Sequence, residues 1–344
     1  MKRLALSFLC ALTLPAFAHA AENNADVKAY LLTTVEKMQV AAADFEKNAT
    51  AYQALIDQAD GDYSRALQTS REDLVRLVTA MQENYKAMDS FGYETIEGIV
   101  AGVKHLVDFD VYLDSGVPKA EASASTTVAP VVLKTKTGRV LEQEGALFTN
   151  LIEPTLWGSN KSYVTALDVN GDGKVAPKEA LPLADVLTAA ATDVRKKIDE
   201  LAAASIAWHP STEDFFAAII TMTPTLSGYF DDWKESRYAK ESSGKFSAVS
   251  RVSDMRGIMS SVAVLYRAVE PQVQAKDKAL ARSITRGFTD ILSFIDRVDA
   301  REKKSRISAP EIDELGNQAK EKADKLVPQV EQAAAVLDVK VQDA

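Results

Sequence analysis

The chain of 344 residues has 47% hydrophobic, 26% charged and 7% aromatic side chains, a balance typical of a folded globular protein and unlike disordered, collagen-like or polytopic membrane proteins. Its 15 glycines and 11 prolines are few for this length, which leaves few turns and favours long helices. The net charge of −9 argues against a nucleic-acid-binding groove, because such a groove needs clustered Lys and Arg.

The first twenty residues have the three parts of a secretory signal peptide. Lys2 and Arg3 precede an apolar run over residues 4–14, and Pro15 and a small-residue pattern at 18–20 follow it. The run is shorter than the roughly 20 residues that span a bilayer. We therefore expect residues 1–20 to be cleaved and residues 21–344 to fold in the periplasm. Cys10, the single cysteine, lies in this segment, so we expect no disulfide and no thiolate metal site in the mature protein.

Apolar residues recur at spacings of three and four along most of the remaining chain, which is the pattern of amphipathic helices. Small and polar residues over about 115–132 indicate a linker between a first half at about 24–116 and a second half at about 140–337. No run alternates as a strand would, so the sequence predicts an all-α protein folded as a helical bundle. Helices are expected at 27–56, 63–88, 141–156, 181–206, 252–269, 279–298 and 308–337, and after a capping box at 211–214.

Residues 168–179 match the calcium-binding loop of an EF-hand. Asp168, Asn170 and Asp172 stand at positions 1, 3 and 5, the Lys174 carbonyl at position 7 and Glu179 at position 12, with a glycine at position 6. Calcium binds six to eight hard oxygen atoms, and the closing glutamate supplies two of them. The sequence therefore predicts one bound Ca²⁺, which we expect to be structural because the loop is single.

A second group of carboxylates precedes this loop. Glu94 and Glu97 are three residues apart and would share one helix face, where two like charges gain most from a bridging cation. Asp114 follows seventeen residues after Glu97 and can join them only if the chain reverses direction. Read alone, the Glu pair is also compatible with an ordinary solvated surface.

These segments resemble a known family. YETIEG and DFDVYLD are similar to the metal-site region of the EfeO-type, imelysin-like proteins, the periplasmic components of bacterial iron uptake, with Glu94, Glu97 and Asp114 at the ligand positions. FTNLIEPTLWG resembles that family's His-x-x-Glu segment; Glu153 is retained, but Asn150 replaces the histidine. KESRYAK resembles an acidic stretch ending in Arg-Tyr, which implies Glu235 as a further ligand. The calcium loop then looks like an insertion.

The resemblance implies two four-helix bundles that bind iron (Fe²⁺ or Fe³⁺) or another hard divalent cation, with an inner-membrane iron permease or a periplasmic peroxidase as a partner. An all-oxygen ligand set suits such hard ions. The sequence thus favours a non-enzymatic metal-binding protein of an iron-uptake pathway. Two alternatives stay open. One is an imelysin-type metallopeptidase, for which no recognised catalytic motif is present. The other is a calcium-stabilised helical scaffold or adhesion protein.

Overall fold

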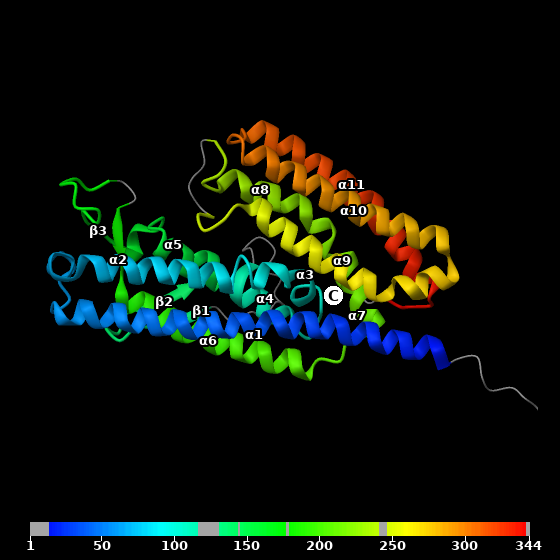
Figure 1. Ribbon diagram of the computed structural model, residues 1–344, viewed down its shortest axis with the longest axis horizontal. Helices are drawn as coiled ribbons and strands as arrows, with labels where there is room; N and C mark the ends of the chain where they lie inside the picture. The colour runs from blue at the N-terminus through cyan, green and yellow to red at the C-terminus, as the bar shows by residue number, and fades with distance from the viewer. Residues whose placement is uncertain (1–13, 116–130, 144, 177–178, 241–245, 342–344) are drawn as a thin grey trace, which may run out of the picture.

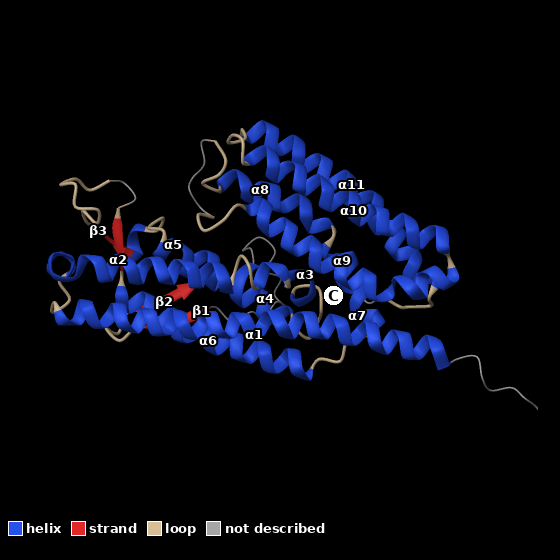
Figure 2. Ribbon diagram, in the orientation of Figure 1, coloured by secondary structure: helices blue, strands red, loops and turns tan. Residues whose placement is uncertain are grey.

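The computed structural model of the protein describes residues 14–115, 131–143, 145–176, 179–240 and 246–341. Long helices make up most of this structure, which confirms the all-α prediction (Figure 2). None of the described helices is long and apolar enough to cross a membrane. Residues 1–13 of the expected signal peptide and 116–130 of the expected linker lie outside the described residues.

In the part of the chain that the structure describes, the first bundle contains three long helices, α1 (Leu14–Gln58), α2 (Tyr63–Met88) and α6 (Ala184–Ala207). α1 packs against both α2 and α6 (Figure 1). Its apolar stripe, which includes Leu31, Phe45 and Tyr52, is fully buried. Because α6 follows the expected linker in the sequence, the first bundle takes helices from both sides of that segment.

The second bundle contains the later helices and lies over one end of the first (Figure 1). α7 begins as the capping box predicts, because the Ser211 side chain accepts a hydrogen bond from the Asp214 backbone N–H at 3.0 Å. α9 contacts α1, α7, α8 and α10, and so joins the two bundles. The members are α7 (Thr212–Met222), the 3-10 turn η5 (Pro224–Ser227), α8 (Gly228–Glu235), α9 (Arg251–Lys276), α10 (Lys278–Glu302) and α11 (Ala309–Val336).

Short broken helices after α2 fill the region between the bundles. Gly98 and Gly102 allow this segment to approach its neighbours closely. A Cβ on Gly98 would lie 2.5 Å from Ser261 Oγ of α9, and one on Gly102 would lie 2.5 Å from Ala218 Cβ of α7. The chain reverses here, as a joint site for Glu97 and Asp114 requires. The elements are the 3-10 turn η1 (Tyr93–Thr95), α3 (Glu97–Val100), α4 (Val107–Asp110) and the π-helix η2 (Val111–Ser115).

Within the described residues, two small antiparallel hairpins interrupt the helical pattern, although no strand is expected from the sequence. β1 (Val131–Lys134) pairs with β2 (Val140–Gln143), and β3 (Val164–Ala166) pairs with β4 (Ala180–Pro182). The prediction of a helix at 141–156 is wrong in its first part. Gly145 (φ 92°) and Ala146 (φ 54°) have left-handed backbones, which end β2 and delay the helix. Helical structure begins with the π-helix η3 (Leu147–Ile152), continues into α5 (Glu153–Leu156), and is followed by the 3-10 turn η4 (Lys161–Tyr163).

Candidate metal centre

The buried charged residues of the described structure gather between the two bundles. They comprise seven carboxyl groups and a single guanidinium, that of Arg251. Seven ionised carboxylates around one cation would repel each other strongly in a medium of low dielectric constant. The region therefore needs protons or a bound cation to balance its charge. The seven carboxyl groups are those of Asp89, Glu94, Glu97, Asp110, Asp114, Glu153 and Asp254.

Three of these carboxyls converge. Asp89 is the residue after α2, Glu94 lies in η1 and Asp114 lies in η2. One carboxylate oxygen from each lies within 4.8 Å of the other two, and the residues are 5%, 0% and 7% exposed. Asp89 Oδ1, Glu94 Oε2 and Asp114 Oδ1 have no hydrogen-bond partner. Buried polar atoms are ordinarily paired, so three such oxygens on converging side chains mark a place for a cation or for shared protons.

Glu97 lies beside this group as the first residue of α3. Its Oε1 accepts a hydrogen bond from the Tyr229 hydroxyl of α8, whereas its Oε2 has no partner. Nearby, the Tyr93 hydroxyl donates to Asp110 Oδ1 at 2.7 Å. The two tyrosines thus fix two outer carboxyls by hydrogen bonds. The structure brings together three of the predicted ligands, Glu94, Glu97 and Asp114.

Arg251 and Asp254 close the group from the first turn of α9. Arg251 Nη1 donates to Glu94 Oε1 and to Asp254 Oδ2, both at 3.0 Å. The guanidinium also lies over two aromatic rings, with its Cζ 5.1 Å from the centroid of Tyr229 and 4.6 Å from that of Phe246. Arg251 therefore holds one oxygen of Glu94 and leaves the other without a hydrogen bond.

Burial raises the pKa values of the converging carboxyls. The pKa of Glu94 rises to about 8, first because of burial and then because of repulsion from Asp254, although Arg251 opposes the shift. Burial followed by repulsion from Asp114 raises the pKa of Asp89, and burial followed by repulsion from Glu94 raises that of Asp114. Without a cation, these groups therefore retain protons at pH values where an exposed carboxyl has lost its proton.

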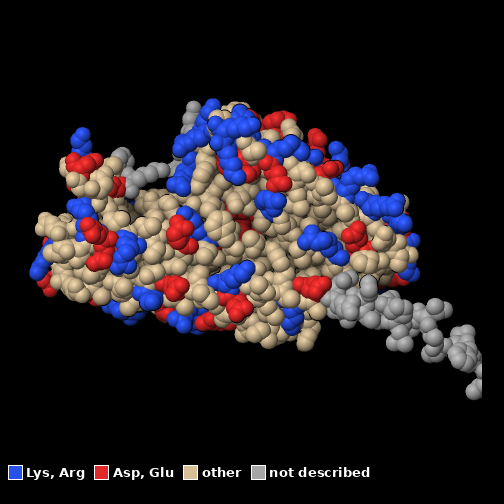
Figure 3. All heavy atoms as spheres, in the orientation of Figure 1, with Lys and Arg blue, Asp and Glu red and all other residues tan. Residues whose placement is uncertain are grey.

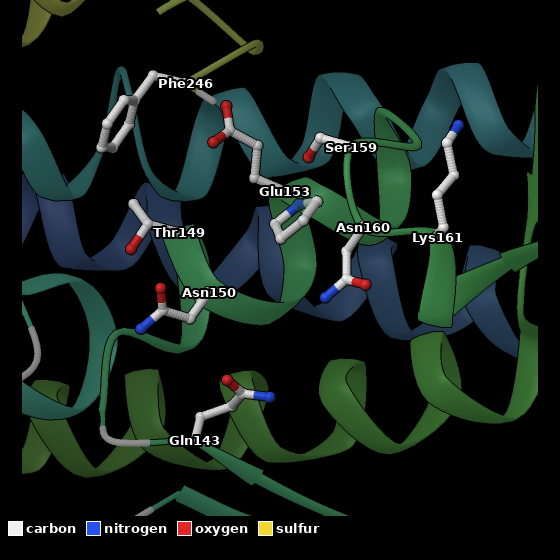
Figure 4. A pocket seen from close by; sticks show the side chains of 9 residues that line it. Gln143, Thr149, Asn150, Glu153, Ser159, Asn160, Lys161 and Phe246 are labelled. Carbon is white, nitrogen blue, oxygen red and sulfur yellow. The ribbon is translucent and has the colours of Figure 1, made fainter. Parts of the chain in front are cut away.

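Glu153 is buried a short way from the converging carboxyls. Its Oε1 accepts hydrogen bonds from the backbone N–H groups of Ser247 and Ala248, both at 2.7 Å, which joins α5 to the segment before α9. Asn150, one turn earlier, is exposed and donates to the Gly145 carbonyl at 3.3 Å. Both residues line a hollow of about 460 Å³, which Figure 4 shows with Phe246 above Asn150 in the view.

A second hollow, of about 710 Å³, leads to the carboxyl group. Asp114, Tyr229, Asp232 and Arg251 are among the residues that line it. Figure 3 shows this face of the molecule depressed between the two bundles, with acidic atoms visible at the bottom of the depression. The converging carboxyls therefore lie beside an opening to solvent.

Glu235, the further ligand implied by the resemblance, is not brought to this group. It is the exposed last residue of α8. Asp232, one turn earlier, is the α8 carboxylate that faces the hollow, and its Oδ2 lies 3.6 Å from Arg251 Nη2. Asp232 and Glu235 are three residues apart and would share one face of a continuing helix. However, α8 ends at Glu235, and the next residue, Ser236, has an extended backbone.

The predicted calcium loop lies between β3 and β4 and not between two helices. It protrudes from the first bundle at the end away from α10 and α11 (Figure 1). Asp168, Asn170, Asp172 and Glu179 all turn side-chain oxygens towards backbone N–H groups of the loop, at 2.6 to 3.1 Å. Arg71 of α2 donates to the carbonyls of Asp168 and Val169 at 2.7 and 2.6 Å and ties the loop to the bundle. Residues 177–178 of the loop lie outside the described residues.

Asp89, Asp232, Arg251 and Asp254 also belong to this region, although they were not among the predicted ligands. A signal for two of them was present. Arg251 and Asp254 fall in register with the buried apolar residues Ile258, Val262 and Leu265 of α9, at spacings of three and four. A charged pair on the buried stripe of a helix requires partners inside the protein. No comparable pattern marks Asp89, which simply follows the end of α2.

A comparison with known families decides the affiliation of the chain. The family model described as Imelysin, named Peptidase_M75, matches residues 141–337. The chain belongs to the imelysin family. The part matched to imelysin contains Glu153, Asp232, Arg251 and Asp254, whereas the three converging carboxyls precede it in the sequence. No curated protein matches the chain.

Proposed function

We propose that this imelysin-family chain is a periplasmic metal-binding protein of a bacterial iron-uptake pathway and that it binds its metal without catalysing a reaction. One observation carries the proposal. Asp89, Glu94 and Asp114 converge within 4.8 Å, are buried, and each keep an oxygen without a hydrogen bond. A cation of two or three positive charges would pair these oxygens and remove the repulsion between them.

The donor chemistry supports a hard cation. Carboxylate oxygens suit iron(III), and among divalent ions they suit manganese, magnesium and calcium better than soft metals. Glu97 lies beside the group and could supply a further oxygen. The resemblance of the Glu94 and Asp114 segments to EfeO-type proteins favours iron, with an inner-membrane permease or a periplasmic peroxidase as the partner. The signal-peptide pattern at residues 1–20 supports the periplasm.

The site's composition favours binding over peptidase chemistry. A catalytic zinc takes three protein ligands, commonly with histidine among them, and keeps one open position. His105 and His209 are both exposed in the described structure, and Asn150 stands where the resemblance would place a histidine. Arg251 of α9 also donates a hydrogen bond to Glu94, which suits a fixed metal ligand better than a catalytic base.

We propose a second, structural site for Ca²⁺ in the loop 168–179. Its support is the filled set of EF-hand positions together with the inward-turned oxygens of Asp168, Asp172 and Glu179. The bound ion would fasten the β3–β4 hairpin and, through Arg71, the adjoining part of α2. The loop is an EF-hand-like insertion that protrudes from the first bundle, away from the short helices α3 and α4 (Figure 1).

Equilibrium dialysis with Mn²⁺, a soluble and redox-stable probe of hard-ion sites, tests the first site. The protein is first treated with a chelator, and the substitution Glu179→Gln disables the calcium loop. Asp114→Asn or Glu94→Gln is then introduced into the Glu179→Gln protein. We expect one Mn²⁺ per chain in the Glu179→Gln protein and an affinity at least about tenfold lower in either double variant, a loss of about 1.4 kcal/mol. The same comparison with iron(III) supplied as its citrate complex tests the proposed cargo.

The chain supplies a matched control for this test. Glu235→Gln removes an exposed carboxylate outside the group and should leave Mn²⁺ binding unchanged. Equal binding in all the variants, or no binding beyond the calcium loop, would contradict the proposal and favour the calcium-stabilised scaffold. Cleavage of a protein substrate that stops on chelation would favour the metallopeptidase instead.

A further inference from the structure

The two hollows beside the carboxyl group share part of their walls. Thr149, Asn150 and Phe246 line both, so the hollow of about 460 Å³ adjoins the hollow of about 710 Å³. Six water molecules around an ion occupy about 180 Å³ at roughly 30 Å³ per water. Either hollow is therefore larger than the hydrated ion that the three carboxyls would bind. A larger ligand fits the space.

The walls offer hydrogen bonds more than apolar surface. The smaller hollow is lined by the amides of Gln143, Asn150 and Asn160, by the hydroxyls of Thr149 and Ser159, and by the ammonium group of Lys161 (Figure 4). Amides, hydroxyls and an ammonium group can all donate to oxygen atoms. Such a lining suits an oxygen-rich organic molecule better than an apolar one.

Arg251 supplies a specific anchor in the wall of the larger hollow. Its Nη1 is engaged by Glu94 and Asp254, but its Nε–H is buried without an acceptor. Its Nη2 lies 3.6 Å from Asp232 Oδ2, longer than an ordinary hydrogen bond. The Nε and Nη2 edge of a guanidinium is a two-pronged donor that matches a carboxylate. Arg251 is 5% exposed and is fixed by stacking against Tyr229 and Phe246.

We propose that the protein takes its metal as a carboxylate chelate, with one carboxylate of the chelator docked on the Nε and Nη2 edge of Arg251 and the rest of it in the two hollows. This inference rests on the proposed function, because Asp89, Glu94 and Asp114 hold the metal of the same complex. The metal links the chelator to the protein and offsets the repulsion between their carboxylates. Asp232, at the mouth, competes with the incoming carboxylate for Arg251.

Iron(III) citrate labelled in both the iron and the citrate carbon is the probe. The wild-type protein is passed through a gel-filtration column equilibrated with the labelled complex. We expect iron and citrate to leave with the protein in equal amounts. Arg251→Lys keeps the charge but loses the two-pronged edge, and Asn150→Leu places an apolar side chain where the hollows meet. Both should lower retained citrate by about tenfold or more, whereas Asp232→Asn should increase it.

Mn²⁺ without any carboxylate chelator separates this inference from the proposed function. If the wild-type protein and Asn150→Leu bind Mn²⁺ equally but differ in citrate retention, both conclusions stand. If Mn²⁺ and iron bind but citrate passes through, or if all variants retain citrate equally, the chelate proposal is wrong and the metal site stands. If neither metal binds, both are wrong. An increase in iron binding with bicarbonate but not with citrate would also overturn the chelate proposal. The Nε and Nη2 edge of Arg251 would then bind a small anion and not a chelator.

Discussion

Replacing Arg251 by Met tests how the buried charges of the site are balanced. Met keeps an unbranched chain of similar reach but removes the bonds of Nη1 to Glu94 Oε1 and Asp254 Oδ2, both at 3.0 Å. Losing both of these buried hydrogen bonds from a charged donor costs roughly 3–5 kcal/mol, since each such bond contributes roughly 1.5–3 kcal/mol. Stacking on Tyr229 and Phe246 adds roughly 0.5–2 kcal/mol, part of which the Met sulfur restores.

Urea unfolding of the metal-free protein at pH 7 measures this cost. We expect Arg251→Met to lower the free energy of unfolding by about 3–5 kcal/mol. Arg256→Met is the matched control on the same helix, because the Arg256–Asp296 pair is about half exposed and such pairs contribute roughly 0–1 kcal/mol. A cost for Arg251→Met no larger than that of the control would refute the reasoning. The carboxyls would then be balanced without the guanidinium.

Three further predictions concern proton linkage, the loop and the packing between the bundles. The pKa of Glu94 is raised in the folded state from 4.5 to about 8, so the folded state binds more protons than the unfolded state between these pH values. The metal-free protein should therefore lose stability as the pH rises through this window, which urea midpoints at pH 5 and 8 measure. Addition of Ca²⁺ should raise the melting temperature, and Glu179→Gln should remove most of that rise; an unchanged calcium response would contradict the loop site. Gly102→Ala should lower the free energy of unfolding by roughly 1–3 kcal/mol, because its Cβ would lie 2.5 Å from Ala218 Cβ; a neutral effect in urea unfolding would show that α7 can move aside.

The helices could be predicted from the sequence because their stripes are long and regular. α2 begins at Tyr63 and ends at Met88, the bounds that the apolar spacing predicts, and α7 begins directly after its capping residue Ser211. The prediction of a helix over 141–156 failed in its first part, where the apolar residues fit a helix but β2 and the positive φ of Gly145 and Ala146 delay it to Leu147. The spacing of apolar residues predicts which residues are buried, but it does not predict the backbone conformation that buries them.

The site could be predicted only in part, for a similar reason. Glu94, Glu97 and Asp114 lie within one short stretch, so a single chain reversal suffices to join them. Asp89 and Asp254 come from the end of one helix and the start of a distant one, and their meeting depends on how the two bundles pack. A short local match also suggested Glu235, whereas Asp232, one turn earlier, faces the hollow. Which carboxylate reaches the group depends on long-range packing, and the local sequence does not predict that packing.

Anomalous X-ray diffraction from crystals of the protein soaked in Mn²⁺ tests the central claim most directly. We expect an anomalous peak between Asp89, Glu94 and Asp114, with their carboxylate oxygens about 2.0–2.3 Å from the ion. Crystals of Asp114→Asn should lose this peak and keep any peak in the 168–179 loop. A peak confined to the loop, or none in the wild-type protein, would contradict the account and leave the buried carboxyls balanced by protons alone.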